Sequence, residues 1–509
     1  MLPKAVEPLQ FESLPQVSLE TGNGKTKSVA PLHKLTDADL NPFILNAKYA
    51  VRGRIPMEAE KLKHQLVEHP GSLPFDKIIN ANIGNPQQLD QKPLTFYRRV
   101  LSVLEDPELI ETAEIASIFP ADVISRAKEL LKSIGSIGAY SHSQGVKIVR
   151  DAVANYITRR DGFPADADDI FLTAGASTAV SYLLELLATG PETGFLIPIP
   201  QYPLYTATIA MNNATAVPYY LNEDDDWSID PTELVRVIEN SIAEGVIPRC
   251  LVLINPGNPT GAILKEDDIA ELLGVAAKYS IFVIADEVYQ ENVYRGEFVS
   301  VKKVLRKLQS SDKSGYYDDV QLASLHSTSK GLTGECGQRG GYMELIGLDP
   351  SVRAQINKLA SISLCGPVTA QALVSLMVNP PKPGDASYPL DHQQREKVYG
   401  DLLKRAHLLF SSFNEMEGVS CQNPMGAMYC FPRFDLPEKA VLESQRAGVA
   451  PDVFYCEQLL LHTGICTVPG SGFGQVEGTY HVRTTFLAPG TDWIEQWKTF
   501  HAEFMATYR

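Results

Sequence analysis

A lysine at the end of an apolar run is the first group in the sequence that could do chemistry. Residues 320–325 are largely apolar and predict a buried strand, and the segment 327–331 (STSKG) carries Lys330 directly after it. Burying an ammonium group is costly unless it is paired or neutralised, whereas a neutral lysine amine is a nucleophile toward carbonyls. The hydroxyl of Ser327 and the guanidinium of Arg339 could bind an anion. The stretch predicts covalent binding of a phosphorylated aldehyde, although a solvated lysine is the simpler alternative for this pattern taken alone.

A carboxylate stands at the end of a second apolar run. Asp286 follows five apolar residues, 281–285, and a buried carboxylate needs a cation or several donors. A helix cap would be the ordinary explanation, but a protonated pyridine nitrogen would also serve. An acid beside that nitrogen keeps it protonated, which makes pyridoxal phosphate an electron sink. Asp286 and Lys330 together predict a pyridoxal 5'-phosphate site in which Lys330 is both the covalent anchor and the catalytic residue.

Five further residues could complete such a site. Asn258 and Tyr289 could donate to the phenolic oxygen of the ring, and Tyr202 could stack on the ring face. The N–H groups near Ala176 and Ser177, at the start of a predicted helix, suit a phosphate. Each residue alone has an ordinary explanation in a turn, a core or a helix start. Most of them follow apolar strands, however, and open α/β sheets bind ligands at the carboxyl ends of their strands.

These groups need a sheet to position them, and the sequence predicts one. From residue 170 onward, short apolar runs alternate with helical patterns. The run 250–254, the helical pattern 266–279 and the run 281–285 form a crossover, which predicts two parallel, buried strands. The expected fold class is α/β, with a large domain around a mostly parallel sheet and a smaller α+β domain, and the resemblance of the chain to a known family implies that the sheet is of the seven-stranded type.

The chain of 509 residues is longer than one core normally serves. Residues 1–40 are polar without periodicity and predict a weakly ordered arm. We expect residues 41–104 to contribute to the small domain and, as the resemblance of the chain to a known family implies, to a dimer interface. The large cofactor-binding domain is expected at 105–385, up to the break at 379–384 (NPPKPG), and the C-terminal small domain at 390–509.

The composition excludes several classes of protein and site. The net charge of -16 argues against binding to nucleic acid or to an anionic membrane. The seven cysteines include no C-x-x-C pair, so neither a disulfide framework nor a metal site is expected. No apolar run is as long as the roughly 18 residues that a membrane span needs.

The first thirty residues bear on localisation. They contain no arginine and are interrupted by Glu7, Glu12 and Glu20. Mitochondrial transit peptides are rich in arginine and poor in acidic residues. A cytoplasmic protein is therefore expected, with the mitochondrial matrix as the alternative.

Several motifs resemble a known family. The segments 255–261 (NPGNPTG) and 285–289 (ADEVY), together with Ser327-x-x-Lys330 and Arg339, resemble the signature of fold-type I pyridoxal-phosphate aminotransferases of class I/II. Three more segments, 81–87 (ANIGNPQ), 138–145 (GAYSHSQG) and 468–487, resemble the alanine aminotransferases within that family. The resemblance covers the chain from about residue 40 to its end. It departs at 364–367 (LCGP), where Cys-Pro-Pro is expected.

The resemblance implies roles that the local patterns do not give. Arg483 matches the arginine that binds the substrate α-carboxylate, Gly84 lets the backbone approach that carboxylate, and Tyr140 reaches the cofactor phosphate of the partner subunit in a homodimer. The implied activity is reversible amino transfer between L-alanine and 2-oxoglutarate, giving pyruvate and L-glutamate. A glutamate/alanine:glyoxylate aminotransferase, a β-eliminating lyase and a non-catalytic relative are the alternatives.

Overall fold

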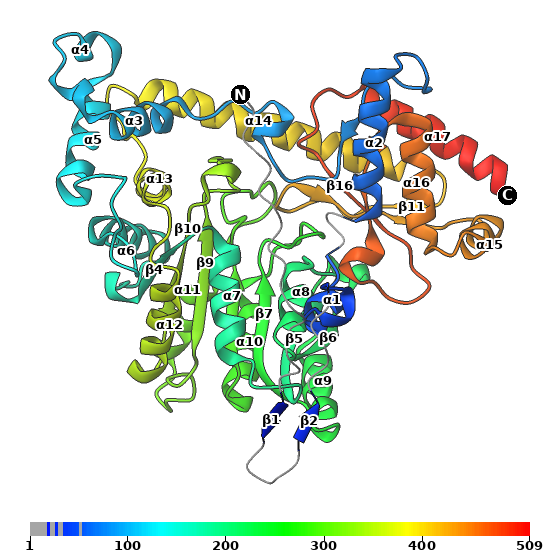
Figure 1. Cartoon of the computed structure of the whole chain (residues 1–509), viewed down its shortest axis with the longest axis horizontal. Coiled ribbons are helices and arrows are strands. Elements are labelled where there is room, and N and C mark those ends of the chain that lie inside the picture. Colours follow the sequence, from blue (N-terminus) through cyan, green and yellow to red (C-terminus); the bar gives the residue numbers. More distant parts are fainter. Residues whose placement is uncertain (1–17, 21–25, 29–33, 50–52) are drawn as a thin grey trace. The chain divides into compact units, whose positions relative to one another are not determined.

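The computed structural model describes residues 18–20, 26–28, 34–49 and 53–509 (Figure 1). The chain divides into two compact units, Met1–Asn46 and Ala47–Arg509. In the first unit, β1 (Ser18–Glu20) pairs antiparallel with β2 (Thr26–Ser28), and a helical turn at Asp37–Asp39 precedes α1 (Pro42–Asn46). The predicted weakly ordered arm lies largely outside the described residues and stays a prediction.

A seven-stranded sheet is the centre of the second unit, with the strand order β4-β10-β9-β8-β7-β5-β6. The strands are β4 (Ile170–Thr173), β5 (Thr193–Ile199), β6 (Thr215–Tyr220), β7 (Ile247–Ile254), β8 (Phe282–Asp286), β9 (Leu322–Ser327) and β10 (Gly341–Ile346). Every neighbouring pair is parallel except the two pairs that β10 makes with β4 and β9. The predicted α/β class with a mostly parallel sheet is confirmed.

The direction of the strands brings their carboxyl ends to one edge of the sheet. Strands β5, β7, β8 and β9 are parallel, so the residues that follow each of them meet there. Strand β10 returns antiparallel, with Gly341 opposite Ser327. The connection 328–340, which carries the predicted lysine and arginine, therefore starts and ends at this same edge.

Helices cover both faces of the sheet, as the buried parallel strands require. One face packs on α9 (Pro231–Ala243), α10 (Glu266–Tyr279) and α11 (Val301–Ser311). The other packs on α7 (Ala176–Leu187), α8 (Leu204–Met211) and α12 (Pro350–Ile362). Alternation along β7 shows the two faces: Leu251 and Leu253 join the first core, and Cys250 and Val252 join the second.

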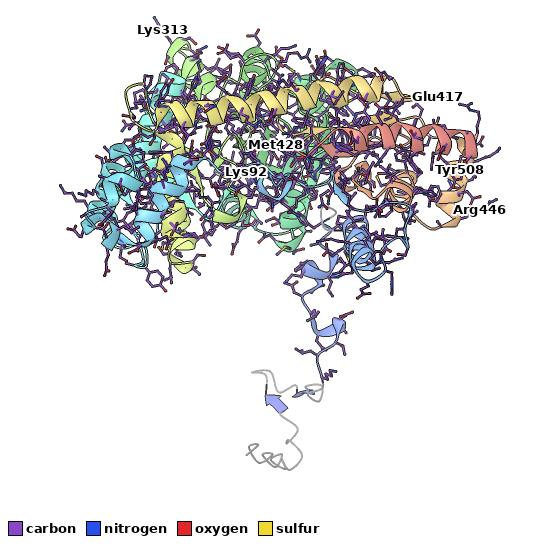
Figure 2. All side chains as sticks on the ribbon, turned by 90° about the horizontal axis from the view of Figure 1, so that it is seen from above. Lys92, Lys313, Glu417, Met428, Arg446 and Tyr508 are labelled. Atoms are coloured by element: carbon purple, nitrogen blue, oxygen red, sulfur yellow. The ribbon has the colours of Figure 1, made fainter. Side chains whose placement is uncertain are left out.

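Two smaller cores flank β4. The first is formed by α3 (Thr95–Glu105), α5 (Ala121–Ile134) and α13 (Val368–Val378). The second joins α6 (Lys147–Asp161) to α13, β4 and Tyr342 of β10. The short helix α4 (Ile115–Ile118) precedes α5. Helix α14 (Tyr388–Asn414) begins with Pro389 in its first turn and runs for 27 residues to the neighbourhood of Glu417 (Figure 2).

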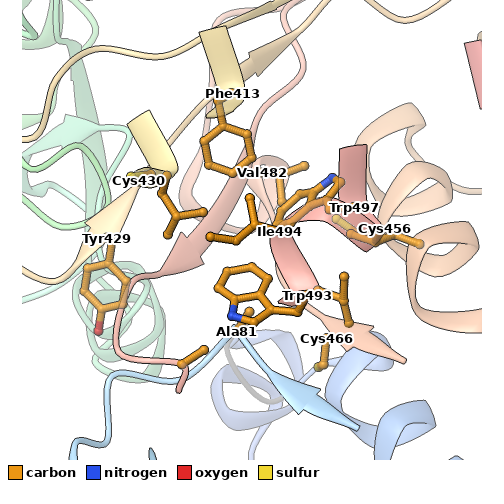
Figure 3. Close-up of a cluster of buried hydrophobic side chains, with 14 of the residues drawn as sticks. Ala81, Phe413, Tyr429, Cys430, Cys456, Cys466, Val482, Trp493, Ile494 and Trp497 are labelled. Carbon is orange, nitrogen blue, oxygen red and sulfur yellow. The ribbon is translucent and has the colours of Figure 1, made fainter. Parts of the chain in front are cut away.

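A separate hydrophobic core lies beyond the sheet, with Trp493 and Trp497 among its largest side chains (Figure 3). Its helices are α2 (Arg54–Glu68), part of α14, α15 (Glu438–Arg446), α16 (Pro451–Thr463) and α17 (Asp492–Tyr508). Its strands are β3 (Ile79–Asn80), β11 (Val419–Ser420), β12 (Tyr429–Cys430), β13 (Arg433–Phe434), β14 (Ile465–Cys466) and β16 (Val482–Thr485). Strand β15 (Val468–Pro469) pairs with β16, and its Val468 joins a small cluster with Trp227, Phe431 and Phe473. Strand β3 pairs with β14, which ties residues near 79 to the C-terminal part of the chain. The domain boundaries expected above remain a prediction.

Among the described residues, no helix is both long enough and apolar enough to cross a membrane.

Candidate active site

The predicted lysine lies at the carboxyl edge of the sheet. Lys330 follows the end of β9 by three residues and is half-buried. Its Nζ donates a hydrogen bond to the carbonyl oxygen of Gly84 at 2.7 Å and lies 5.9 Å from the ring centroid of Tyr289. The amine is therefore held between the large sheet and the loop that follows β3.

The predicted carboxylate has one oxygen satisfied and one left over. Asp286 is the last residue of β8 and is 6% exposed. Its Oδ2 accepts a hydrogen bond from the Tyr205 hydroxyl at 2.8 Å, whereas Oδ1 has no partner among the described residues. Burial raises the pKa of Asp286, although the Tyr205 hydroxyl, the Val288 N–H and the charge of Lys330 act against it. An unpartnered buried carboxylate oxygen is unusual and fits the N–H of a pyridinium ring.

An anion site is present at the start of α7. Arg339 donates from Nη1 to the Ser329 hydroxyl and from Nη2 to the Ser177 hydroxyl, both at 3.2 Å. The guanidinium can lie there because the preceding residue of the helix is Gly175, where a Cβ would overlap Arg339 Nη2. Ala176 is the first residue of α7, so its N–H belongs to the free N–H groups of the helix start. Hydroxyls, a guanidinium and a helix N-terminus together suit a phosphate group.

Ser327 lies beside the serine that contacts Arg339. It is the last residue of β9 and is buried, and its hydroxyl accepts a hydrogen bond from the Ser329 N–H at 3.3 Å. Ser329 is the serine that reaches Arg339. A phosphate contact by Ser327 stays a prediction, and Ser329 joins the candidate residues.

Two tyrosines face each other beside the lysine. The Tyr289 hydroxyl donates to the Tyr429 hydroxyl at 3.3 Å. Burial raises the pKa of Tyr289, and the neighbouring Tyr429 raises it further. Burial alone would raise the pKa of Tyr429 too, but the charges of Lys330 and Arg483 and the Tyr289 hydrogen bond lower it overall. Tyr289 is therefore the harder of the two phenols to ionise, and its hydroxyl is the donor in the hydrogen bond between them.

Arg483 on β16 is fixed from several directions. It is 1% exposed, and it donates from Nη1 to the Asn258 side-chain oxygen at 3.1 Å and from Nη2 to the Asn82 carbonyl at 2.6 Å. Its Cζ lies 4.2 Å from the ring centroid of Tyr429 and 4.6 Å from that of Phe473. Its Nε has no partner among the described residues. A buried guanidinium with a free donor fits a carboxylate ligand.

Gly84 makes the close approach of these groups possible. A Cβ at this position would overlap the Tyr429 hydroxyl and would lie 3.1 Å from Lys330 Nζ. The absence of a side chain therefore allows the loop after β3 to reach the lysine. The backbone approach to the substrate carboxylate that the resemblance implies for Gly84 remains a prediction.

Two of the predicted residues lie at the margin of the site. Tyr202 follows the end of β5 and is half-buried, with its hydroxyl 2.6 Å from that of Tyr49. Tyr140 is 79% exposed and makes none of the side-chain hydrogen bonds or ring contacts found among the described residues. The structure thus brings together every predicted site residue except Tyr140.

Sequence reasoning missed four residues of this arrangement: Tyr205, Ser329, Tyr429 and Phe473. Ser329 carried a signal, because it stands beside Lys330 in the same short motif. The three aromatic residues carried none, since each occupies a position that an ordinary core residue would fill.

A pocket of about 440 Å³ adjoins the arginine, and Phe473 is part of its wall. Arg54, Lys48 and Gln201 also line it, and the buried Gln201 Oε1 has no partner among the described residues. The pocket offers cationic and polar groups next to the proposed carboxylate site.

Comparisons with known proteins agree with this geometry. The family model for aminotransferase class I and II matches residues 115–493. A Saccharomyces cerevisiae protein named mitochondrial alanine aminotransferase is 57% identical over 502 residues, which cover 97% of this chain and 84% of that protein. Another from the same organism, named inactive alanine aminotransferase, is 57% identical over 486 residues, or 94% and 96% of the two chains. The solved structure of alanine aminotransferase from Pyrococcus furiosus has a TM-score of 0.70 at 25% identity and covers 91% of this chain and 100% of its own.

Proposed function

The chain belongs to the aminotransferase class I and II family, and from that membership we propose that it is an alanine aminotransferase. It reversibly transfers the amino group between L-alanine and 2-oxoglutarate, giving pyruvate and L-glutamate. The observation that carries the proposal is the pair of unpartnered buried atoms, Asp286 Oδ1 and Arg483 Nε, in the site that holds Lys330. One fits a protonated ring nitrogen and the other fits a substrate carboxylate.

The residues of the site fit pyridoxal 5'-phosphate, the cofactor of this family. When bound, the cofactor supplies an aldehyde that takes the amino group and a protonated ring that withdraws electrons from the substrate Cα. Asp286 would keep the ring nitrogen protonated. Arg339, the serine hydroxyls and the N–H groups at the start of α7 would bind the phosphate, and Tyr202 would stack on the ring. Tyr289 and Asn258 would donate to its phenolic oxygen.

Arg483 and Lys330 act on the substrate. The planar guanidinium of Arg483 binds the α-carboxylate, and its hydrogen bonds to Asn258 and Asn82 fix its orientation. Binding of the α-carboxylate there would orient the Cα toward Lys330 Nζ. The lysine takes the Cα proton as a general base and later returns a proton as a general acid.

The test is an absorbance spectrum of the purified holoenzyme before and after L-alanine is added. The band of the bound cofactor should change with L-alanine and return with 2-oxoglutarate, and initial rates should follow ping-pong kinetics. If the absorbance of the bound cofactor does not change when L-alanine is added, L-alanine is not the amino donor, and the family assignment still holds. Parallel assays with 2-oxoglutarate and glyoxylate separate the alanine aminotransferase from a glyoxylate-preferring enzyme.

A non-catalytic relative is the second candidate, because one of the similar yeast proteins is named as inactive. The presence of Lys330, Asp286 and Arg483 in one site supports an active enzyme. Absence of turnover with bound cofactor, across a panel of amino donors, would favour the inactive relative.

We further propose a homodimer in which Tyr140 of one subunit reaches the cofactor phosphate of the other. The exposure of Tyr140 supports this role. Mixing the Tyr140→Ala and Lys330→Ala variants provides a test, because a mixed dimer would hold one site with both residues intact. Activity should rise above that of either variant alone, and a monomer by sedimentation would contradict the proposal.

For localisation, the acidic residues Glu7, Glu12 and Glu20 support the cytoplasm. The names of similar mitochondrial enzymes support the alternative, the mitochondrial matrix. Cell fractionation with an antibody against the C-terminal helix separates the two.

A further inference from the structure

Tyr429 lies where the two chemical parts of the site meet. It is 2% exposed on β12, and it pairs with Thr485 of β16, the strand that carries Arg483. Figure 3 shows it at the margin of the hydrophobic cluster, with its hydroxyl turned away from Trp493 and Trp497. The side chain therefore does more than fill that core, because its hydroxyl points out of the cluster.

The ring of Tyr429 contacts the carboxylate-binding arginine. Arg483 Cζ lies 4.2 Å from the ring centroid, within the range of a cation–π interaction. Since Arg483 is buried, the interaction is little screened by water. The ring thus helps to fix the plane in which the guanidinium meets a ligand.

The hydroxyl of Tyr429 lies at the other end, beside the proton-transfer groups. It accepts the hydrogen bond of Tyr289 at 3.3 Å and occupies the space that a side chain at Gly84 would fill. The carbonyl oxygen of Gly84 holds Lys330 Nζ at 2.7 Å. One phenol therefore touches the arginine with its ring and the neighbours of the lysine with its hydroxyl.

We propose that Tyr429 is a positioning residue for amino transfer with two separable parts: the ring orients Arg483, and the hydroxyl orients Tyr289 and the Gly84 loop that holds Lys330. This inference rests on the proposed function. It predicts that substrate binding and turnover respond to different atoms of the same side chain.

Two substitutions separate the parts. Tyr429→Phe keeps the ring and removes the hydroxyl, whereas Tyr429→Leu removes both. The holoenzyme is titrated with 2-oxoglutarate by calorimetry without any amino donor, which measures carboxylate binding alone. Turnover with L-alanine and 2-oxoglutarate is measured alongside.

Tyr429→Phe should bind 2-oxoglutarate within about twofold of wild type and lower kcat about tenfold. Tyr429→Leu should weaken 2-oxoglutarate binding about tenfold as well. Tyr342→Phe is the matched control, because Tyr342 is buried and its hydroxyl has no partner among the described residues. This control should keep both the binding constant and kcat of wild type.

Wild-type kcat in Tyr429→Phe would overturn the role of the hydroxyl, and wild-type binding in Tyr429→Leu would overturn the role of the ring. Equal losses of binding in the two variants would show a merely structural residue and overturn the proposal. The wild-type enzyme tests the underlying function independently, since its own lack of transaminase activity would reject that function. In that case the binding titrations still decide the role of the ring.

Discussion

The site contains two arginines that serve two anions, and they are built differently. Arg339 is exposed and bonds to serine hydroxyls and backbone carbonyls at the start of a helix. Arg483 is buried between two aromatic rings and bonds to an amide and a carbonyl. At Arg339, an anion meets positive charge from several sources, including the helix N-terminus. At Arg483, anion binding depends on the planar shape of one guanidinium.

The neighbourhoods of the two arginines differ in origin as well. The groups around Arg339 follow the strands of one sheet, whose parallel direction brings them to one edge. Those around Arg483 include Asn258, which follows β7 of the sheet, but the others come from the loop after β3, from β12 and from the segment near Phe473. The difference teaches that sheet topology builds the cofactor side, whereas the substrate side joins one residue of the sheet edge to segments outside the sheet.

The largest effect is expected where the two sides meet. Lys330→Ala should lower kcat by about 10³- to 10⁴-fold, because the proton at Cα then has no positioned base. Steady-state assays measure this loss, and dialysis followed by absorbance shows whether the cofactor is still retained. Normal turnover in this variant would contradict the proposed mechanism.

Arg483→Lys should lower kcat/KM for L-alanine by about 100-fold, since an ammonium cannot copy a planar, stacked, bidentate donor. Cofactor affinity should stay at the wild-type value, because the change is confined to the substrate side. A loss of cofactor affinity equal to the loss of kcat/KM would break the distinction between the two sides.

Arg339→Lys makes the same substitution in the arginine on the cofactor side. A lysine binds phosphate well as a point charge, so the dissociation constant of pyridoxal phosphate should rise only about fivefold. At saturating cofactor the KM for L-alanine should match wild type. Fluorescence titration of the cofactor-free protein measures the constant. A fold-change in the cofactor dissociation constant larger than the fold-change in kcat/KM caused by Arg483→Lys would contradict the expected order of the two effects.

The smallest effect on activity is expected for a substitution of Glu287, which follows Asp286 at the end of β8. Glu287 is fully buried, and its carboxylate accepts hydrogen bonds from the Val301 N–H at 2.8 Å and from the Ser324 hydroxyl at 2.7 Å. Burial raises the pKa of Glu287 to about 7, although Arg160 and these donors act against it. The folded protein therefore keeps a proton that the unfolded chain loses near pH 4.5.

The folded state then binds more protons than the unfolded state between these two pH values, so the free energy of unfolding falls as pH rises through this window. Glu287→Gln should remove up to about 3 kcal/mol of that pH dependence and change kcat less than about threefold. Urea unfolding of both proteins at pH 5 and pH 8 measures it. Parallel stability profiles would contradict the assigned titration.

The sequence allowed most of the residues that the structure brings together around Lys330 to be named, and their contacts with the cofactor remain predictions. Lys330 and Asp286 each interrupt an apolar pattern at a strand end, and that signal is local. Tyr205 escaped prediction, because a tyrosine in a short apolar helix resembles a core residue until Asp286 is seen beside it. On the substrate side, Arg483 and Gly84 came only from family resemblance. Their contacts join segments whose proximity no local pattern encodes.

The tight fit between Gly84 and Tyr429 constrains how this site can evolve. A methyl group at position 84 collides with the phenol, whereas a smaller side chain at position 429 would make room for it. The two positions are therefore epistatic, and the order of substitutions decides which intermediates survive. A lineage that first shortens residue 429 can later replace the glycine. One that changes the glycine first has to pass through a protein in which the new side chain overlaps Tyr429 and lies close to Lys330 Nζ.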